Sequence, residues 1–203
     1  MSSVRRIILS SANLKKNEKK LARTSVLEVA NELFYRCGIR AVGVETIVNQ
    51  AGVAKISLYR SFPSKDDLIT AYLEARAASF WREWDEAVDE QDDPHAQLLA
   101  IMAHLTRQMT APGYRGCPFI NYTSEFSDPA HPGHGVVKAA KAETRRRFTK
   151  LTTALGSPFP EQLADSLLLM VEGAFAISQT YGSDPIDSLH WGAEVLINAH
   201  QRR

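Results

Sequence analysis

A run of basic and polar side chains follows a glycine turn in the first third of this sequence. The stretch 51–65 reads AGVAKISLYRSFPSK, and it places Lys55, Ser57, Tyr59 and Arg60 within six residues. Lysine and arginine can bind guanine or phosphate, and serine and tyrosine hydroxyls commonly bind phosphate oxygens. Such side chains on one exposed helix face favour contact with DNA, although a solvated charged face on an ordinary helix bundle would have the same composition.

Two short helices are predicted to position these side chains. The first spans about residues 44–51, a tight turn follows at Gly52, and the second helix ends before Pro63. Apolar residues have spacings that suit packing against a preceding helix: Val44, Ile47, Val48, Ala51, Val53, Leu58 and Phe62. This pattern is typical of a helix-turn-helix, whose second helix fits a major groove roughly 12 Å wide.

The expected DNA contacts follow from that placement. We expect Lys55, Ser57, Tyr59 and Arg60 to contact DNA from the second helix. Thr46 and Lys65 flank this helix, and we expect both to contact phosphates.

The whole chain is predicted to be all-α, with about nine helices. Helix-ending and helix-starting residues recur, and strand-like alternation is nowhere sustained. Ser64 is expected to cap the fourth helix, with Asp67 at the reciprocal position of a capping box. The expected helices span about residues 18–37, 44–51, 55–62, 65–90, 94–111, 118–128, 135–156, 160–181 and 185–203.

Charge divides the chain into two parts with different tasks. Residues 1–65 carry 12 Lys and Arg against 4 Asp and Glu, whereas the rest of the chain carries 12 against 19. The basic part would attract a polyanion and the acidic part would not. We expect a basic arm at 1–18, either a disordered tail that grips DNA or a frayed end. A helix-turn-helix DNA-binding domain at 19–65 and a helical effector-binding and dimerisation domain at 66–203 would follow.

The N-terminal third also resembles a known family. The relevant residues are Ala30, Leu33-Phe34, Gly38-Ile39-Arg40, Val44 to Ile47, Ala51 to Lys55, Leu58-Tyr59, Phe62 and Ser64 to Leu68. Through them residues 21–73 resemble the DNA-binding region of the TetR (tetracycline-repressor-like) family of bacterial regulators. The resemblance implies a homodimeric repressor, less often an activator, that leaves double-stranded operator DNA when a small molecule binds the C-terminal domain. Gly43 departs from the Ser or Thr that caps the second helix in many members.

A small-molecule pocket is expected between the middle helices, because members of that family bind ligands there. In the run YRGCPFINYTSEF, a helix starting at Pro118 would place Asn121 and Glu125 on one face, with Cys117 at its lip. Apolar walls with a few polar groups suit such a pocket, although aromatic side chains at helical spacing are more often core. The expected lining is Trp84, His104, Cys117, Phe119, Asn121, Tyr122 and Glu125.

Two further hypotheses concern this region. Arg115 and the start of a helix could lower the pKa of Cys117 and make it a thiol sensor, but a lone cysteine is usually a small apolar residue. His131 and His134 have no further clear ligands beside them, so we expect no metal site, and no cofactor motif is present.

The last two long helices are expected to form the dimer interface. The eighth helix is apolar beyond one stripe, so it has a second surface to bury. The resemblance implies a four-helix interface made by two helices from each subunit. We expect the interface to contain Leu167, Val171, Phe175, Leu189 and Leu196.

Other functional classes have less support. The sequence has no glycine-rich phosphate loop, no G-x-S-x-G elbow and no H-E-x-x-H motif, so we expect no enzyme. The alternatives are a helical enzyme or a protein-interaction module without specific DNA binding. No apolar run approaches the roughly 18 residues of a membrane span, and two distant cysteines fit reduced thiols, so we expect a cytoplasmic protein without membrane partners.

Overall fold

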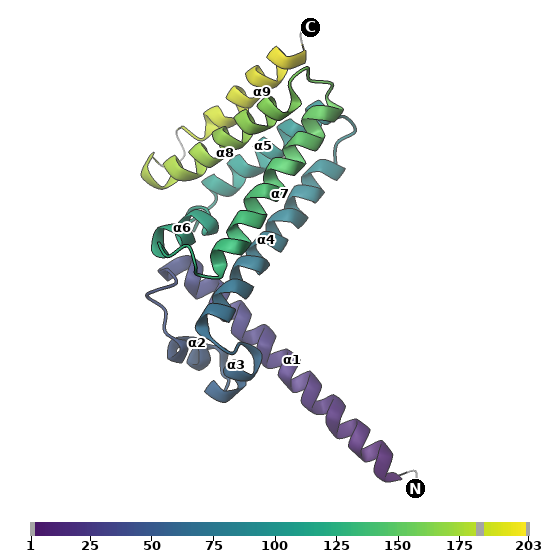
Figure 1. Cartoon of the computed structure of the whole chain (residues 1–203), viewed down its shortest axis with the longest axis vertical. Coiled ribbons are helices and arrows are strands. Elements are labelled where there is room, and N and C mark those ends of the chain that lie inside the picture. The colour runs from purple at the N-terminus through teal and green to yellow at the C-terminus, as the bar shows by residue number, and fades with distance from the viewer. Residues whose placement is uncertain (1–2, 182–184, 202–203) are drawn as a thin grey trace. The chain divides into compact units, whose positions relative to one another are not determined.

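The computed structural model describes residues 3–181 and 185–201, with side chains for 19–181 and 185–200 (Figure 1). Within these ranges every regular element is a helix, which confirms the all-α prediction with about nine helices. None of these helices is long and apolar enough to cross a membrane. The helices are α1 (Ser3–Cys37), α2 (Val44–Ala51), α3 (Lys55–Ser61), α4 (Lys65–Asp89), α5 (Pro94–Thr110), α6 (Pro118–Glu125), α7 (Gly133–Ala154), α8 (Pro160–Tyr181) and α9 (Asp187–Gln201).

Local capping explains several helix boundaries. The Asp67 carboxylate accepts a hydrogen bond from the Ser64 backbone N–H (2.8 Å), and Ser64 Oγ accepts one from the Asp67 N–H (3.0 Å), which confirms the capping box. Asp93 caps α5 by accepting from the backbone N–H groups of His95 and Ala96. Gly43 makes no side-chain cap for α2, as its lack of a side chain requires.

The first helix differs from its prediction at its start. The sequence predicts a start near Glu18, whereas α1 begins at Ser3. No proline or glycine lies between these two positions, so nothing in the local sequence forces the helix to stop. The side chains of the expected arm, residues 1–18, lie outside the described residues.

The chain divides into two compact units. Unit 1 comprises residues 1–73 and 125–133, and unit 2 comprises residues 74–124 and 134–203. The sequence predicts a boundary at residue 65, but the first turns of α4 belong to unit 1. Their side chains are part of its core, because Leu68, Ile69 and Tyr72 are buried and the Tyr72 ring meets Phe34 edge-on at 5.5 Å.

Unit 1 has its core where α2 and α3 pack on α1 (Figure 1). The apolar side of α1 contributes Val26, Ala30 and Phe34, and all three side chains are buried. Ile47 of α2 and Leu58 of α3 are also fully buried. The three helices therefore share one apolar core, as the spacing of these residues predicts.

The segment 125–133 joins unit 1 through Glu125. Its carboxylate accepts hydrogen bonds from the backbone N–H groups of Ile39 (3.0 Å) and Arg40 (2.7 Å), just after the end of α1. Gly38 has a positive φ of 90°, and a side chain there would meet Glu125 Oε1 at 3.3 Å. Glu125 therefore holds the α1–α2 turn, and its place in the lining of an effector pocket stays a prediction.

Unit 2 is a helical layer in which α5 packs on α8 and α9, and α8 packs on α9. Each of the three consecutive arginines of α7 binds an acidic side chain, and Arg145 and Arg146 are exposed while Arg147 is half-buried. Arg145 pairs with Asp165 of α8, Arg146 pairs with Glu143 of α7, and Arg147 pairs with both Glu143 and Asp85 of α4.

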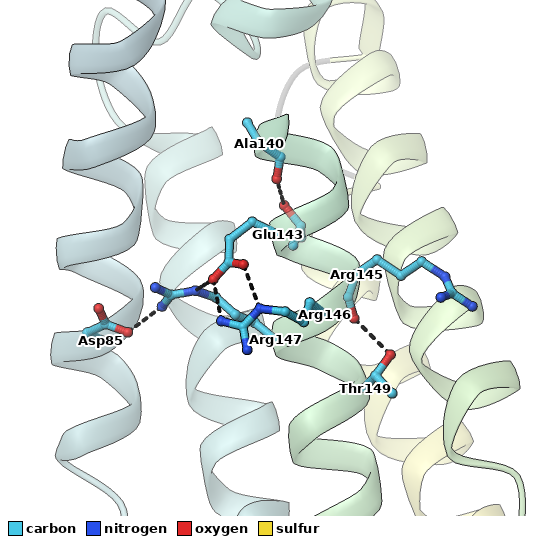
Figure 2. Close-up of polar contacts among 8 residues, drawn as sticks. Asp85, Ala140, Glu143, Arg145, Arg146, Arg147 and Thr149 are labelled. Atoms are coloured by element: carbon cyan, nitrogen blue, oxygen red, sulfur yellow. Dashed lines mark hydrogen bonds and ion pairs between the residues drawn. The ribbon is translucent and has the colours of Figure 1, made fainter. Parts of the chain in front are cut away.

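Figure 2 shows the ion pair of Arg147 with Asp85, which joins α7 to α4, and the pairs of Glu143 with Arg146 and Arg147 within α7. The Arg147 guanidinium also lies over the Trp81 ring, 4.5 Å from its centroid. Hydrogen bonds from Arg146 and Arg147 outweigh the effect of partial burial and lower the pKa of Glu143 from 4.5 to about 2. Glu143 is therefore charged at neutral pH and binds both Arg146 and Arg147, and Arg147 also pairs with Asp85 of α4.

We predict that Glu125→Ala destabilises unit 1. Two backbone N–H groups lose a charged acceptor, which should cost about 1–3 kcal/mol of unfolding free energy. Urea denaturation measures the loss. Hydrogen exchange should locate it, because the amides of Ile39 and Arg40 should exchange faster.

The matched control is Ser124→Ala, which removes only a hydrogen bond within α6, from Ser124 Oγ to the Ile120 carbonyl. It should leave exchange at Ile39 and Arg40 as in the wild type. Unchanged exchange at both amides in Glu125→Ala would contradict the role given to this carboxylate.

We also predict that Glu143→Gln destabilises unit 2 in a pH-dependent way. A carboxyl group whose pKa is lower in the folded state stabilises the fold above its unfolded pKa, and this contribution disappears as pH falls through the folded pKa. The free energy of unfolding of the wild type should exceed that of the variant by about 1 kcal/mol at pH 7. That difference should shrink between pH 4.5 and about 2.

Urea denaturation of both proteins across this pH range provides the measurement. Glu74→Gln, which neutralises an exposed carboxylate of α4, serves as the control and should not reproduce the trend. A difference between wild type and Glu143→Gln that stays constant with pH would argue against the assigned pKa.

Candidate nucleic-acid interface

The α2–α3 pair is held in one orientation by its turn and by its buried side. Gly52 ends α2 in the left-handed backbone conformation, with φ 65° and ψ 31°, and residues that have a Cβ rarely adopt this conformation. Leu58 of α3 and Phe62 just after it are buried, and the Arg23 guanidinium of α1 lies over the Phe62 ring at 4.6 Å. Because this side of α3 is fixed against α1, the opposite side faces outward.

The outward side carries most of the predicted DNA-binding residues. Tyr59 and Arg60 are exposed on α3, and Thr46 is exposed on α2. Ser57 is half-buried. These positions leave Thr46, Tyr59 and Arg60 able to reach a phosphate or a base edge without rearrangement of the core.

Lys55 begins α3 and is already paired. Its ammonium group forms an ion pair with Glu45 of α2, and both side chains are more than half exposed. The hydrogen bond to Glu45 raises the pKa of Lys55, so this residue is a cation at neutral pH. Exposed ion pairs of this kind contribute little stability, so a phosphate could replace the carboxylate at low cost.

Lys65, which the sequence predicts to contact a flanking phosphate, binds the backbone of unit 1. Its ammonium group donates a hydrogen bond to the Ile39 carbonyl (2.8 Å) and lies 5.8 Å from the centroid of the Phe34 ring. Burial lowers its pKa. Lys65 starts α4 beside the α1–α2 turn and binds that turn, and its contact with a phosphate stays a prediction.

Sequence reasoning missed Ile56, the second residue of α3. Its side chain is 60% exposed, although isoleucine is among the residue types most often buried. Helical spacing places Ile56 on the same face as Tyr59 and Arg60, three and four residues later. That spacing is the signal in the sequence that could have identified it.

The expected effector-pocket residues other than Glu125 lie in unit 2, where the structure gives them several separate environments. Trp84 of α4 is buried and packs edge-on against Phe148 of α7 at 4.9 Å. His104 of α5 lies 3.4 Å from the Glu83 carboxylate. Both therefore take part in contacts between neighbouring helices.

The remaining four expected lining residues are on α6 and its start. Cys117, Phe119 and Tyr122 are buried, and Asn121 donates to the Arg115 carbonyl at 2.8 Å. Side chains in a packed core and side chains that line a closed pocket are both buried to this degree, so burial does not distinguish the two. The effector pocket therefore stays a prediction for these residues.

A polar cluster connects α6 with α7 and α8. The Lys141 ammonium lies 3.9 Å from Cys117 Sγ and forms an ion pair with Glu172. It also lies 5.7 Å from the centroid of the Phe119 ring. Burial raises the pKa of the Cys117 thiol despite the nearby lysine, which favours the neutral thiol over a reactive thiolate.

Two other features of unit 2 bear on ligands. A surface hollow of about 420 Å³ is lined by residues of α4, α5 and α9, including His95, Arg107 and His190, and by none of the predicted pocket residues. Within the described part of the chain, no group of three or more His, Cys, Asp or Glu residues could hold a metal ion.

Most of the residues predicted to form a dimer interface lie inside the subunit. Four of the five predicted residues, Leu167, Val171, Phe175 and Leu189, are buried inside the subunit, and Leu196 is half-buried. A different face of α8 is apolar and exposed, with Leu169, Ile177 and Tyr181 separated by multiples of four residues. Trp191 and Val195 are exposed on α9, also four residues apart.

Comparisons with known proteins agree with this architecture. Residues 26–72 match the profile of the bacterial regulatory proteins of the tetR family. The HTH-type transcriptional regulator YjdC of Escherichia coli K12 is 25% identical over 180 residues, which cover 87% of this chain and 94% of that protein. That relative is a transcriptional regulator.

Two solved structures from Streptomyces are similar along most of the chain. A TetR-family transcriptional regulator from Streptomyces coelicolor has a TM-score of 0.85 and 29% identity, covering 90% of this chain and 97% of that chain. A protein of Streptomyces avermitilis described as a TetR transcriptional regulator has a TM-score of 0.78 and 32% identity, covering 90% of this chain and 99% of that chain. The chain therefore belongs to the TetR family and is a DNA-binding transcriptional regulator.

Proposed function

We propose that this regulator is a homodimeric repressor that leaves its operator in the cytoplasm when a small molecule binds unit 2. The outward face of α3 carries the proposal, because Tyr59 and Arg60 are exposed there while Leu58 is buried on the opposite side. In the proposed complex α3 enters the major groove, with Lys55 and Ser57 beside these residues and Thr46 on a phosphate.

The connectivity of the chain supports a route from effector to DNA. Helix α4 belongs to unit 1 up to Leu73 and to unit 2 from Glu74 onward. Helix α6 belongs to unit 2 up to Ser124, and its last residue, Glu125, holds the α1–α2 turn of unit 1. A ligand in unit 2 would act through these connections, provided that it binds the DNA-competent and released conformations unequally.

The exposed apolar face of α8 and α9 supports the homodimer. A side chain on Gly192 would meet Met170 Cε at 2.8 Å, so the two helices approach closely and present their outer residues together. We assign Leu169, Ile177, Tyr181, Trp191 and Val195 to the interface. A twofold axis through it would direct two α3 helices to successive major grooves, roughly 34–36 Å apart.

The first test is operator binding. We expect the protein to retard DNA that flanks its own gene, with an affinity that falls steeply as salt rises. Arg60→Ala should weaken operator binding by about 1–3 kcal/mol and relax specificity, because a base-reading guanidinium is lost. Fluorescence anisotropy with labelled operator and a non-specific duplex measures both effects.

Arg107→Ala removes an exposed arginine of α5 in unit 2 and serves as the charge-matched control. It should bind the operator as the wild type does. If Arg60→Ala and Arg107→Ala lose the same affinity, the effect is one of general charge. If Arg60→Ala or Tyr59→Ala loses no affinity, that residue does not contact the operator.

The second test is the dimer. Leu169 is 72% exposed in the subunit, so Leu169→Arg should not disturb its core but should place a charge in the proposed interface. We expect the variant to sediment as a monomer at micromolar concentrations at which the wild type is a dimer. Sedimentation velocity provides the measurement.

The control is Leu21→Arg, since Leu21 is 70% exposed on α1 of unit 1. This variant should remain dimeric. A wild type that sediments as a monomer would rule out the homodimer, and a dimeric Leu169→Arg would rule out this face of α8.

A further inference from the structure

We propose that Ile56 reads the C5-methyl group of a thymine in the operator. The inference rests on the proposed function, because it assumes that α3 enters the major groove. It adds an apolar specificity contact to a surface where sequence reasoning finds only polar and charged ones.

The placement of Ile56 supplies the first argument. Its side chain is 60% exposed, between Lys55 and Ser57 on α3, and its face of the helix is shared with Tyr59 and Arg60. Leu58, two residues later, is fully buried. Ile56 therefore lies on the face that would meet base edges and not on the face that packs against α1.

The surroundings of Ile56 indicate a small apolar partner. An exposed apolar patch that marks a protein-binding site is typically larger than a few hundred Å². Among the side chains of unit 1 that the structure describes, from residue 19 onward, the exposed large hydrophobic ones are Leu21, Ile56 and Tyr59. Lys55 and Arg60 of α3 and Glu45 of α2 are charged and exposed. A single methyl group in a polar groove fits such a site better than a protein surface does.

The chemistry of the major groove supplies that methyl group. Thymine is distinguished there by its O4 acceptor and its C5-methyl, and apolar side chains contact the methyl. Isoleucine has no hydrogen-bonding group in its side chain, so it cannot select a base through donors or acceptors. Its branched Cβ strongly favours one χ1 rotamer in a helix, so little side-chain freedom is lost on contact.

The test replaces each thymine of the operator, one at a time, with deoxyuridine, which lacks only the methyl group. Wild-type affinity should fall about fourfold per half-site at one thymine, as expected for one buried methyl group. Ile56→Ala should bind the thymine operator more weakly and should bind the thymine and deoxyuridine forms of that position equally. Ile56→Val keeps the branched Cβ and should retain part of the discrimination.

Leu21→Ala is the matched control, because it also truncates an exposed apolar side chain in unit 1. It should preserve the thymine preference of the wild type. Thermal unfolding of each variant is measured alongside, and since Ile56 is exposed, Ile56→Ala should melt as the wild type does.

The outcomes separate the two levels of the proposal. If the wild type binds no operator, the proposed function and this inference both fail. If the wild type binds tightly but no substituted thymine changes affinity, or if Ile56→Ala keeps the full preference, then only the role of Ile56 is overturned.

Discussion

The burial of Leu58 and Phe62 beneath α3 is the interaction on which the DNA-binding surface depends. A helix of seven residues is too short to be stable alone, so its existence and its orientation come from packing against α1. Both side chains are almost fully buried, and Arg23 covers the Phe62 ring. Because one side of α3 is fixed in this way, the direction of Ile56, Tyr59 and Arg60 follows from helix geometry alone.

The parts of this arrangement that could be predicted are those with local signals. Gly52 identifies the turn, Pro63 identifies the end of α3, and Ser64 with Asp67 identifies the start of α4. Each signal acts through backbone geometry or a hydrogen bond within a few residues. The start of α1 lacks such a signal, and there the predicted and observed helix ends differ most.

Contacts between residues distant in the sequence could not be predicted. Glu125 accepts hydrogen bonds from the N–H groups of residues 39 and 40, which precede it by 86 and 85 positions. The periodicity of α6 predicts only that Glu125 shares a helix face with Asn121. The faces of α8 present a related difficulty. Leu167 and Leu169 are two residues apart and chemically identical, yet the first is fully buried and the second is exposed. When a helix is apolar on several faces, only its neighbours determine which face is inside.

Two lysines near α3 show why a count of positive charges does not locate a DNA-binding surface. Lys65 donates to the Ile39 carbonyl, and burial lowers its pKa, so moving it to a phosphate would leave that carbonyl without its donor. Lys55 pairs with Glu45 in a largely exposed position, where the loss of the carboxylate partner costs little. The hydrogen bond to Glu45 raises the pKa of Lys55, so Lys55 is a cation at neutral pH. Of these two cations, Lys55 is therefore the one that DNA can recruit without destabilising the unit that presents it.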